Sequence, residues 1–168
     1  MLKNLIVLIC VAVFAVSCLK KGDSGCPYPS NNFTAPQSEQ EALATYLDTN
    51  GIIAVKHPSG FYYNITDPGT GTDSVGLCSL VQVAYEGRLI NGTVFDSSDG
   101  IVFTLGGTIE GWRKGIPLLK KGGKMKLYIP PSLAYGDMDR RDQNEQVVIP
   151  GKSILLFDVT LQDYSPAK

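Results

Sequence analysis

The stretch YEGRLINGTVFDSS, residues 85–98, predicts a β-hairpin. The residues leading into it, CSLVQVAYEG (78–87), alternate between two faces with a period of two, which is typical of a strand. Asn91-Gly92 is a favoured sequence for a tight hairpin turn. The expected hairpin brings together side chains that resemble active-site material, namely Tyr85, Phe95 and Asp96.

Strand-like segments continue on both sides of this hairpin. Between the third and fourth of the expected strands, Trp112, Ile116 and Leu119 recur at helical spacing and predict one short helix with an apolar face. Pro117 limits how far that helix runs. The pattern predicts an α+β fold, an antiparallel sheet with one short helix across it. The further expected strands are GFYYNIT (60–66), IVFTL (101–105), KMKLYIP (124–130) and SILLFDVTLQDY (153–164).

The N-terminus has the features of an export signal. Residues 5–16 form an unbroken apolar run, about 18 Å long as a helix and too short for a hydrocarbon core of roughly 30 Å. This favours a signal peptide over a spanning helix. The sequence AVSC (15–18) resembles the bacterial lipobox, which implies that residues 1–17 are a lipoprotein signal peptide and that Cys18 carries lipid. Ordinary signal cleavage and an uncleaved anchor are the alternatives.

Two segments precede the expected domain, which covers residues 58–165. Residues 18–35 are rich in Gly, Pro, Ser and Asn and predict a flexible tether. Residues 36–57 predict a helical extension that begins with a capping box formed by Ser38 and Glu41. An apolar stripe, Leu43, Tyr46 and Leu47, favours packing of this helix on the main domain over a role as a spacer.

Several kinds of chemistry are disfavoured by the residues. A formal net charge of −1 argues against a nucleic-acid binder with a basic surface. The single histidine, His57, lies far from Cys26 and Cys78, so neither a metal site nor a nucleophile beside a base is indicated. The glycine-rich segments 69–76 and 120–125 lack the complete nucleotide-binding motifs. Cys26 and Cys78 could form a disulfide in an exported protein, or remain as two free thiols.

Four blocks in the chain resemble FKBP-type peptidyl-prolyl cis–trans isomerases. They are VAYEGRLINGTVFDSS (83–98), GTIEGWRKGI (107–116), IPPSLAYG (129–136) and VIPGKSILLFDVTL (148–161). The resemblance implies a five-stranded antiparallel sheet wrapped around one short helix, preceded here by the N-terminal helical extension. It also implies isomerisation of Xaa-Pro bonds without a cofactor or metal.

The resemblance further implies an apolar pocket for the prolyl ring. The backbone N–H of Ile109 and the hydroxyl of Tyr135 would bond the substrate backbone. Asp96 would set the polarity of the pocket and hold Tyr85, with a turn cap as the alternative role. The apolar residues expected there are Trp112 as the floor, Tyr85, Phe95 and Phe157 as walls, Ile101 in place of a further aromatic wall, and Ile109, Val148 and Ile149 at the rim.

The expected partners and location follow from the same resemblance. Proline-containing unfolded or exported polypeptides would be substrates, macrolide-type FKBP ligands could occupy the pocket, and a lipid anchor would hold the protein in the bacterial cell envelope. Two departures concern the pocket: only Asp99-Gly100 separates Ser98 from Ile101, and the segment 137–146 is long and charged. A catalytically weak binding module or chaperone, or a structural envelope lipoprotein, is therefore an alternative function.

Overall fold

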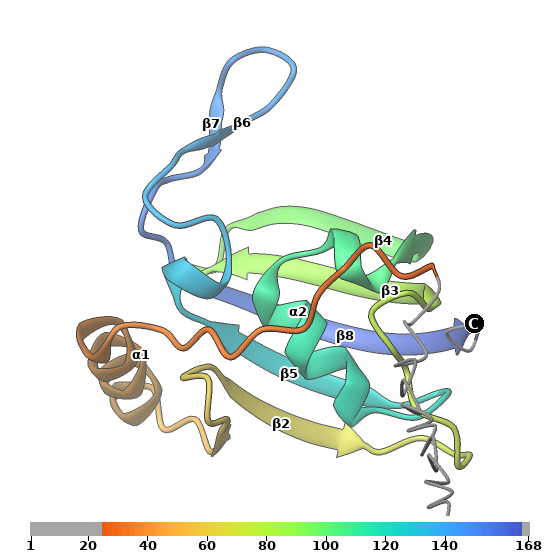
Figure 1. Ribbon diagram of the computed structural model, residues 1–168. Helices are drawn as coiled ribbons and strands as arrows, with labels where there is room; N and C mark the ends of the chain where they lie inside the picture. The colour runs from red at the N-terminus through yellow and green to blue at the C-terminus, as the bar shows by residue number, and fades with distance from the viewer. Residues whose placement is uncertain (1–24, 166–168) are drawn as a thin grey trace, which may run out of the picture.

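A six-stranded antiparallel sheet dominates the computed structural model, which describes residues 25–165. The order of its strands is β1-β2-β5-β8-β3-β4, and helix α2 lies across one face (Figure 1). A separate two-stranded hairpin projects from one end of the domain. The strands are β1 Val55–Lys56, β2 Tyr62–Asp67, β3 Leu80–Leu89, β4 Val94–Thr104, β5 Lys124–Ile129, β6 Arg140–Arg141, β7 Val147–Ile149 and β8 Leu155–Tyr164. The helices are α1 Gln37–Thr49 and α2 Glu110–Gly115, with 3₁₀ turns at Leu105–Gly107, Ile116–Leu118 and Pro131–Leu133.

The predicted α+β fold is confirmed, and the five expected strands correspond to β2, β3, β4, β5 and β8. The sixth, β1, is a two-residue edge strand from within the helical extension. The sequence predicted two separate runs here, the second arm of the 85–98 hairpin and the strand 101–105, whereas β4 is one continuous strand from Val94 to Thr104. Residues 96–100 are polar or glycine and carry no strand pattern of their own. Their extended backbone is held by pairing with β3.

The hydrophobic core lies between α2 and the sheet face beneath it. Met125, Leu127 and Ile129 alternate inward along β5, as the period of two predicts. Trp112, Ile116 and Leu119 cover them from the helical segment, and a 3₁₀ turn containing Pro117 ends that segment. Full burial of each large apolar side chain contributes about 1.5–3 kcal/mol, so this layer fixes α2 on the sheet.

Helix α1 packs against the opposite face of the sheet. Leu43 and Leu47 are buried beside Tyr128 and Leu156, whose side chains alternate outward from the main core. The expected packing role is therefore confirmed. The expected capping box is wrong, because Pro36 occupies the N-cap and no side chain caps the helix. With proline as the N-cap, the helix begins two residues earlier than expected, at Gln37, and Ser38 lies inside it.

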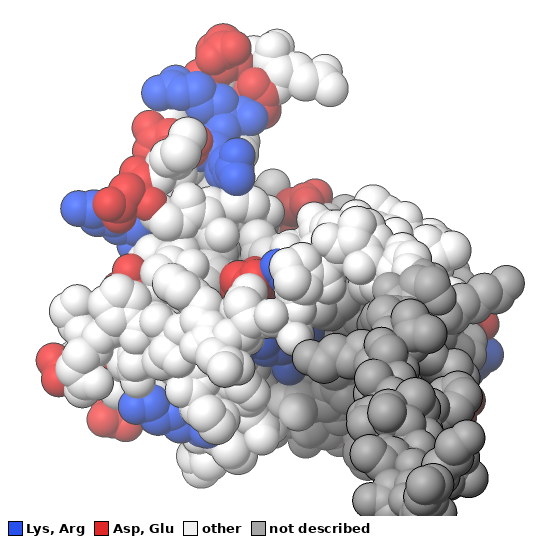
Figure 2. Space-filling model, viewed as in Figure 1, with Lys and Arg blue, Asp and Glu red and all other residues white. Residues whose placement is uncertain are grey.

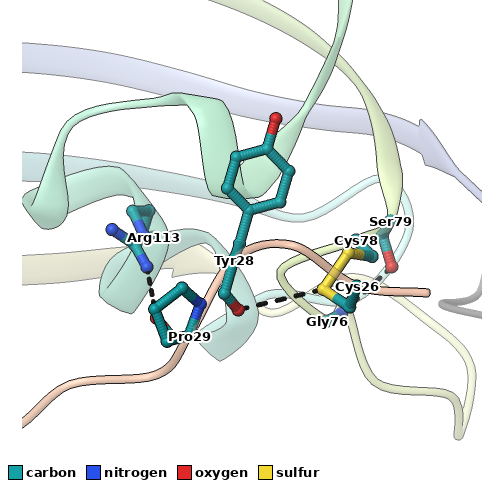
Figure 3. The surroundings of a disulfide bond; sticks show 7 residues. All are labelled: Cys26, Tyr28, Pro29, Gly76, Cys78, Ser79 and Arg113. Carbon is teal, nitrogen blue, oxygen red and sulfur yellow. Dashed lines mark hydrogen bonds between the residues drawn. A yellow bond between two sulfur atoms is a disulfide. The ribbon is translucent and has the colours of Figure 1, made fainter. Parts of the chain in front are cut away.

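A disulfide between Cys26 and Cys78, with Cα atoms 5.6 Å apart, joins the N-terminal segment to the domain (Figure 3). The sequence left this pairing open against two free thiols, because a contact across 52 residues has no local signature. The pair anchors what we call the strap, residues 26–35. Along the strap, the ring of Tyr28 packs directly on the backbone of Gly106.

The strap is also hydrogen-bonded to α2. Arg113 donates to the carbonyl of Pro29 (2.7 Å), and Lys114 Nζ donates to the carbonyl of Asn31 (2.8 Å). The strap has neither helix nor strand, as expected of the predicted tether, but these contacts fix it to the domain. Residues 26–35 of the predicted tether are therefore held on the domain, and its residues 18–24 lie outside the described residues. Cys18 and the predicted signal peptide lie outside the described residues, among which no helix is long and apolar enough to cross a membrane.

Candidate active site

A cavity of about 570 Å³ opens between α2, the β3–β4 hairpin and the segment that follows β5. Most of the residues around it are apolar or aromatic, and they come from parts of the chain up to 72 positions apart (Tyr85 to Phe157). The lining consists of Tyr85, Phe95, Asp96, Ile101, Phe103, Gly107, Thr108, Ile109, Glu110, Trp112, Ala134, Tyr135, Arg140 and Phe157. Eight of the ten site residues predicted from the sequence are in this set.

The aromatic rings of the cavity pack around Trp112. The ring centroids of Tyr85 and Phe157 lie 5.1 and 5.2 Å from that of Trp112, and both rings meet it nearly edge-on. Phe95 meets Phe157 in the same way at 5.6 Å. Such pairs contribute about 0.5–1.5 kcal/mol each beyond their buried area, so the rings hold one another in place. Trp112 is only 6% exposed and forms a rigid apolar floor.

Gly87 in β3 allows two of these rings to approach the sheet. A β-carbon at this position would lie 2.5 Å from the ring of Phe95 and 2.9 Å from that of Phe157. Any larger residue would therefore displace both rings. The positions of Phe95 and Phe157 in the cavity wall therefore require glycine at position 87.

Two polar side chains of the wall are linked by a short hydrogen bond. The hydroxyl of Tyr85 donates to Oδ2 of Asp96 at 2.6 Å. Burial and this bond raise the pKa of Tyr85 well above its usual value. Burial also raises the pKa of Tyr135, partly offset by Arg140. Both hydroxyls therefore stay protonated at physiological pH. The Tyr85 proton is used in the bond to Asp96, whereas within residues 25–165 the Tyr135 hydroxyl has no partner and can donate to a bound molecule.

The backbone around Ile109 leaves a donor free at the start of α2. Ile109 is the N-cap residue, and within residues 25–165 its N–H donates to no carbonyl or side chain. A helix leaves its first N–H groups without partners inside the helix. This donor and the Tyr135 hydroxyl belong to residues of the same cavity.

Val148 and Ile149, which were expected at the rim, do not line this cavity. Ile149 is buried in the core and Val148 packs against the core, while strand β7 that contains them pairs with β6. The long charged segment 137–146 forms much of this hairpin, which places Arg140 of β6 at the cavity in their stead. In this structure the two residues therefore contact the core rather than the cavity, and their place at the rim of a substrate-bound pocket stays a prediction.

Other cavity residues were missed by the sequence. Phe103 is half-buried, and its ring lies 5.5 Å from that of Trp112. The alternation along its strand indicates that the side chain points inward, but it does not distinguish a core residue from a residue of the cavity wall. Arg140 stands over the ring of Tyr135, with its Cζ 4.5 Å from the ring centroid. Nothing in the polar sequence around Arg140 indicated this position.

Comparison with known proteins identifies a family whose matched segment contains the whole cavity lining. The family model for FKBP-type peptidyl-prolyl cis-trans isomerase matches residues 73–162. The isomerase FkpA of Escherichia coli K12 is 41% identical over 113 residues, which are 65% of this chain and 39% of the relative. The peptidyl-prolyl cis-trans isomerase Mip of Coxiella burnetii is 40% identical over 107 residues, which are 61% of this chain and 44% of the relative. The matched segment thus spans less than half of each relative.

Solved structures agree with these matches. The crystal structure of FkpA from Escherichia coli superposes with a TM-score of 0.64 and 36% identity, covering 78% of this chain and 59% of that one. A peptidyl-prolyl cis-trans isomerase from Pseudomonas syringae gives a TM-score of 0.64 at 27% identity, covering 82% of this chain and 99% of that one. The chain belongs to the family of FKBP-type peptidyl-prolyl cis-trans isomerases.

Proposed function

We propose that the protein catalyses cis–trans isomerisation of Xaa-Pro bonds in the cavity around Trp112. The observation that carries this proposal is a cavity whose floor and walls are packed aromatic rings, and within the described chain no serine, cysteine or histidine lines it. Rotation about the amide bond faces a barrier of about 18–20 kcal/mol, which arises from resonance. No covalent bond is broken in this reaction. A catalyst therefore needs a pocket that fits the twisted amide and excludes water, rather than a nucleophile.

In the proposed mechanism, the prolyl ring lies on Trp112 between Tyr85, Phe95 and Phe157. The Ile109 N–H and the Tyr135 hydroxyl hold the substrate backbone on either side of the rotating bond. The apolar walls remove water from the amide and favour the twisted form, in which resonance is lost. Binding that is stronger for the twisted amide than for either planar isomer lowers the barrier.

Asp96 supports this arrangement through Tyr85. Its carboxylate accepts the Tyr85 hydroxyl at 2.6 Å and so fixes the ring against Trp112. The described chain has no ion pair at Asp96, which leaves its charge at the cavity edge. Ile101, which is 44% exposed, adds an aliphatic surface on the same side.

The same cavity could bind proline segments without accelerating their rotation. Strand β4 continues through Asp99-Gly100 without a loop, and Ile101, which lines the cavity, is 44% exposed to solvent. A binding module or chaperone with weak turnover is therefore the second candidate function. Macrolide-type ligands would compete with peptides in either case.

We place the protein in the bacterial cell envelope, anchored by lipid on Cys18 and acting on exported polypeptides. The AVSC sequence at 15–18 supports the anchor, and the Cys26–Cys78 disulfide supports an oxidising compartment. Residues 18–25 would then act as the tether to the membrane. Cell fractionation checks this: Cys18→Ala should release the protein from the membrane fraction, and retention there would contradict the lipid anchor.

A peptide isomerisation assay tests the enzymatic function. Uncatalysed exchange of Xaa-Pro bonds takes on the order of 10–100 s, so acceleration is readily measured at low temperature. We expect the rate constant to rise linearly with protein concentration. A rate equal to that of buffer would overturn the enzyme proposal, and peptide binding without acceleration would instead support the binding module.

A further inference from the structure

We propose that Arg140 makes the protein select substrates with an acidic side chain next to the proline. The inference rests on the proposed function and concerns its substrate class. Arg140 lies in β6 of the projecting hairpin and lines the same cavity as Tyr85, Phe157 and Tyr135. It is the one cationic side chain among the described residues of the cavity lining.

The guanidinium of Arg140 is held at the cavity, but its N–H donors have no partner within the described residues. Its Cζ stands 4.5 Å from the centroid of the Tyr135 ring, a cation–π contact that holds the planar group beside the cavity. Within residues 25–165, the side chain makes neither an ion pair nor a hydrogen bond. A guanidinium has five N–H donors arranged in a fork that matches a carboxylate. These donors are therefore available to a substrate.

The two acidic residues of the lining do not neutralise Arg140. The carboxylate of Glu110 is already bonded to Arg113 and to the Asn31 amide (3.1 Å), with Lys114 Nζ at 4.0 Å. Asp96 accepts the Tyr85 hydroxyl and lies beyond ion-pair distance of Arg140. A substrate carboxylate near Arg140 meets unused donors, whereas a substrate amine there meets repulsion.

Three of the other charged side chains of the hairpin, Asp139, Arg141 and Asp142, bond to one another or to the backbone. Figure 2 shows side chains of both signs gathered on this projection, above a face that is mostly uncharged. Arg141 donates to the carbonyl of Glu145 (2.8 Å) and pairs with Asp139 (3.5 Å). Asp142 accepts the backbone N–H groups of two residues in the turn. Neighbouring strand residues point to opposite faces, and Arg141 is not part of the cavity lining.

Arg141 therefore provides a matched control for Arg140. Two series of short peptides with a single proline test the inference, with Glu, Gln or Lys directly before the proline in one series and directly after it in the other. In at least one series we expect wild-type protein to give a kcat/KM about fivefold higher for Glu than for Lys. Arg140→Gln should lower this ratio to one or below, Arg140→Lys should retain part of it, and Arg141→Gln should leave it unchanged. Added salt should weaken the wild-type ratio.

Two results would overturn the inference: a wild-type ratio of one in both series, or a ratio that persists in Arg140→Gln. Turnover of the Gln peptides reports separately on the proposed isomerase activity. Where turnover is absent, dissociation constants of the same peptides, measured by isothermal titration calorimetry, give the Glu-to-Lys ratio and decide the inference by the same criteria.

Discussion

Replacing Trp112 with leucine is expected to lower kcat/KM for a proline peptide about 100-fold, or about 2.7 kcal/mol of transition-state stabilisation. Leucine keeps the site apolar but removes the flat floor on which the prolyl ring would lie. It also removes the ring that holds Tyr85 and Phe157 at centroid distances of 5.1 and 5.2 Å. The walls would then lose their fixed orientation along with the floor. The peptide isomerisation assay measures the change directly.

Phe61→Leu is the matched control for loss of a buried aromatic ring. Phe61 is fully buried and stacks on His57 with ring centroids 4.3 Å apart, but it is not part of the cavity lining. We expect it to cost about 1–2 kcal/mol of unfolding free energy and to leave kcat/KM within about twofold of wild type. Equal loss of activity in both variants, with both folded by circular dichroism, would remove Trp112 from the proposed mechanism.

Reduction of the Cys26–Cys78 disulfide is expected to lower the unfolding free energy by about 2–4 kcal/mol. The bond closes a loop with a sequence separation of 52 residues, so its loss frees many conformations of the unfolded chain. It also releases the anchored end of the strap. For a chain of this size the melting temperature should fall by about 4–16 °C. Urea unfolding with and without a reducing agent gives the free-energy difference.

The double variant Cys26→Ser, Cys78→Ser separates the disulfide from other effects of the reductant. We expect it to match the reduced wild type in stability and to be insensitive to reducing agent, even though the full chain has further cysteines at 10 and 18. Equal stability of the oxidised and reduced wild type would show that the strap is held by its hydrogen bonds to α2 and by the packing of Tyr28 on Gly106 alone.

The fold could be predicted from the sequence wherever a local pattern repeats. The period of two placed Met125, Leu127 and Ile129 on the core face of β5, and helical spacing placed Trp112, Ile116 and Leu119 over them. The N-terminus of α1 was harder to predict. Ser38 and Glu41 have the spacing of a capping box, but proline at position 36 takes the N-cap and the helix begins earlier.

Much of the candidate site could also be predicted, since the blocks of the family resemblance contain most of its lining. The parts that could not be predicted depend on how segments meet. Phe103 has the inward direction of a core residue, and only the position of α2 determines that its ring faces Trp112 beside a cavity. Arg140 lies in a charged segment whose hairpin turns it onto Tyr135.

By itself, the sequence determined the sheet and the helix across it, because side-chain periodicity acts over short distances along the chain. The aromatic pocket was implied by the family resemblance of the four blocks. Only the tertiary structure decided between a disulfide and two free thiols, and only it showed that the strap is bonded to α2. It also showed that Arg140 lines the cavity, whereas Val148 and Ile149 do not. These features rest on contacts between distant segments. Such contacts depend on the packing of the whole domain, and no local pattern of residues predicts them.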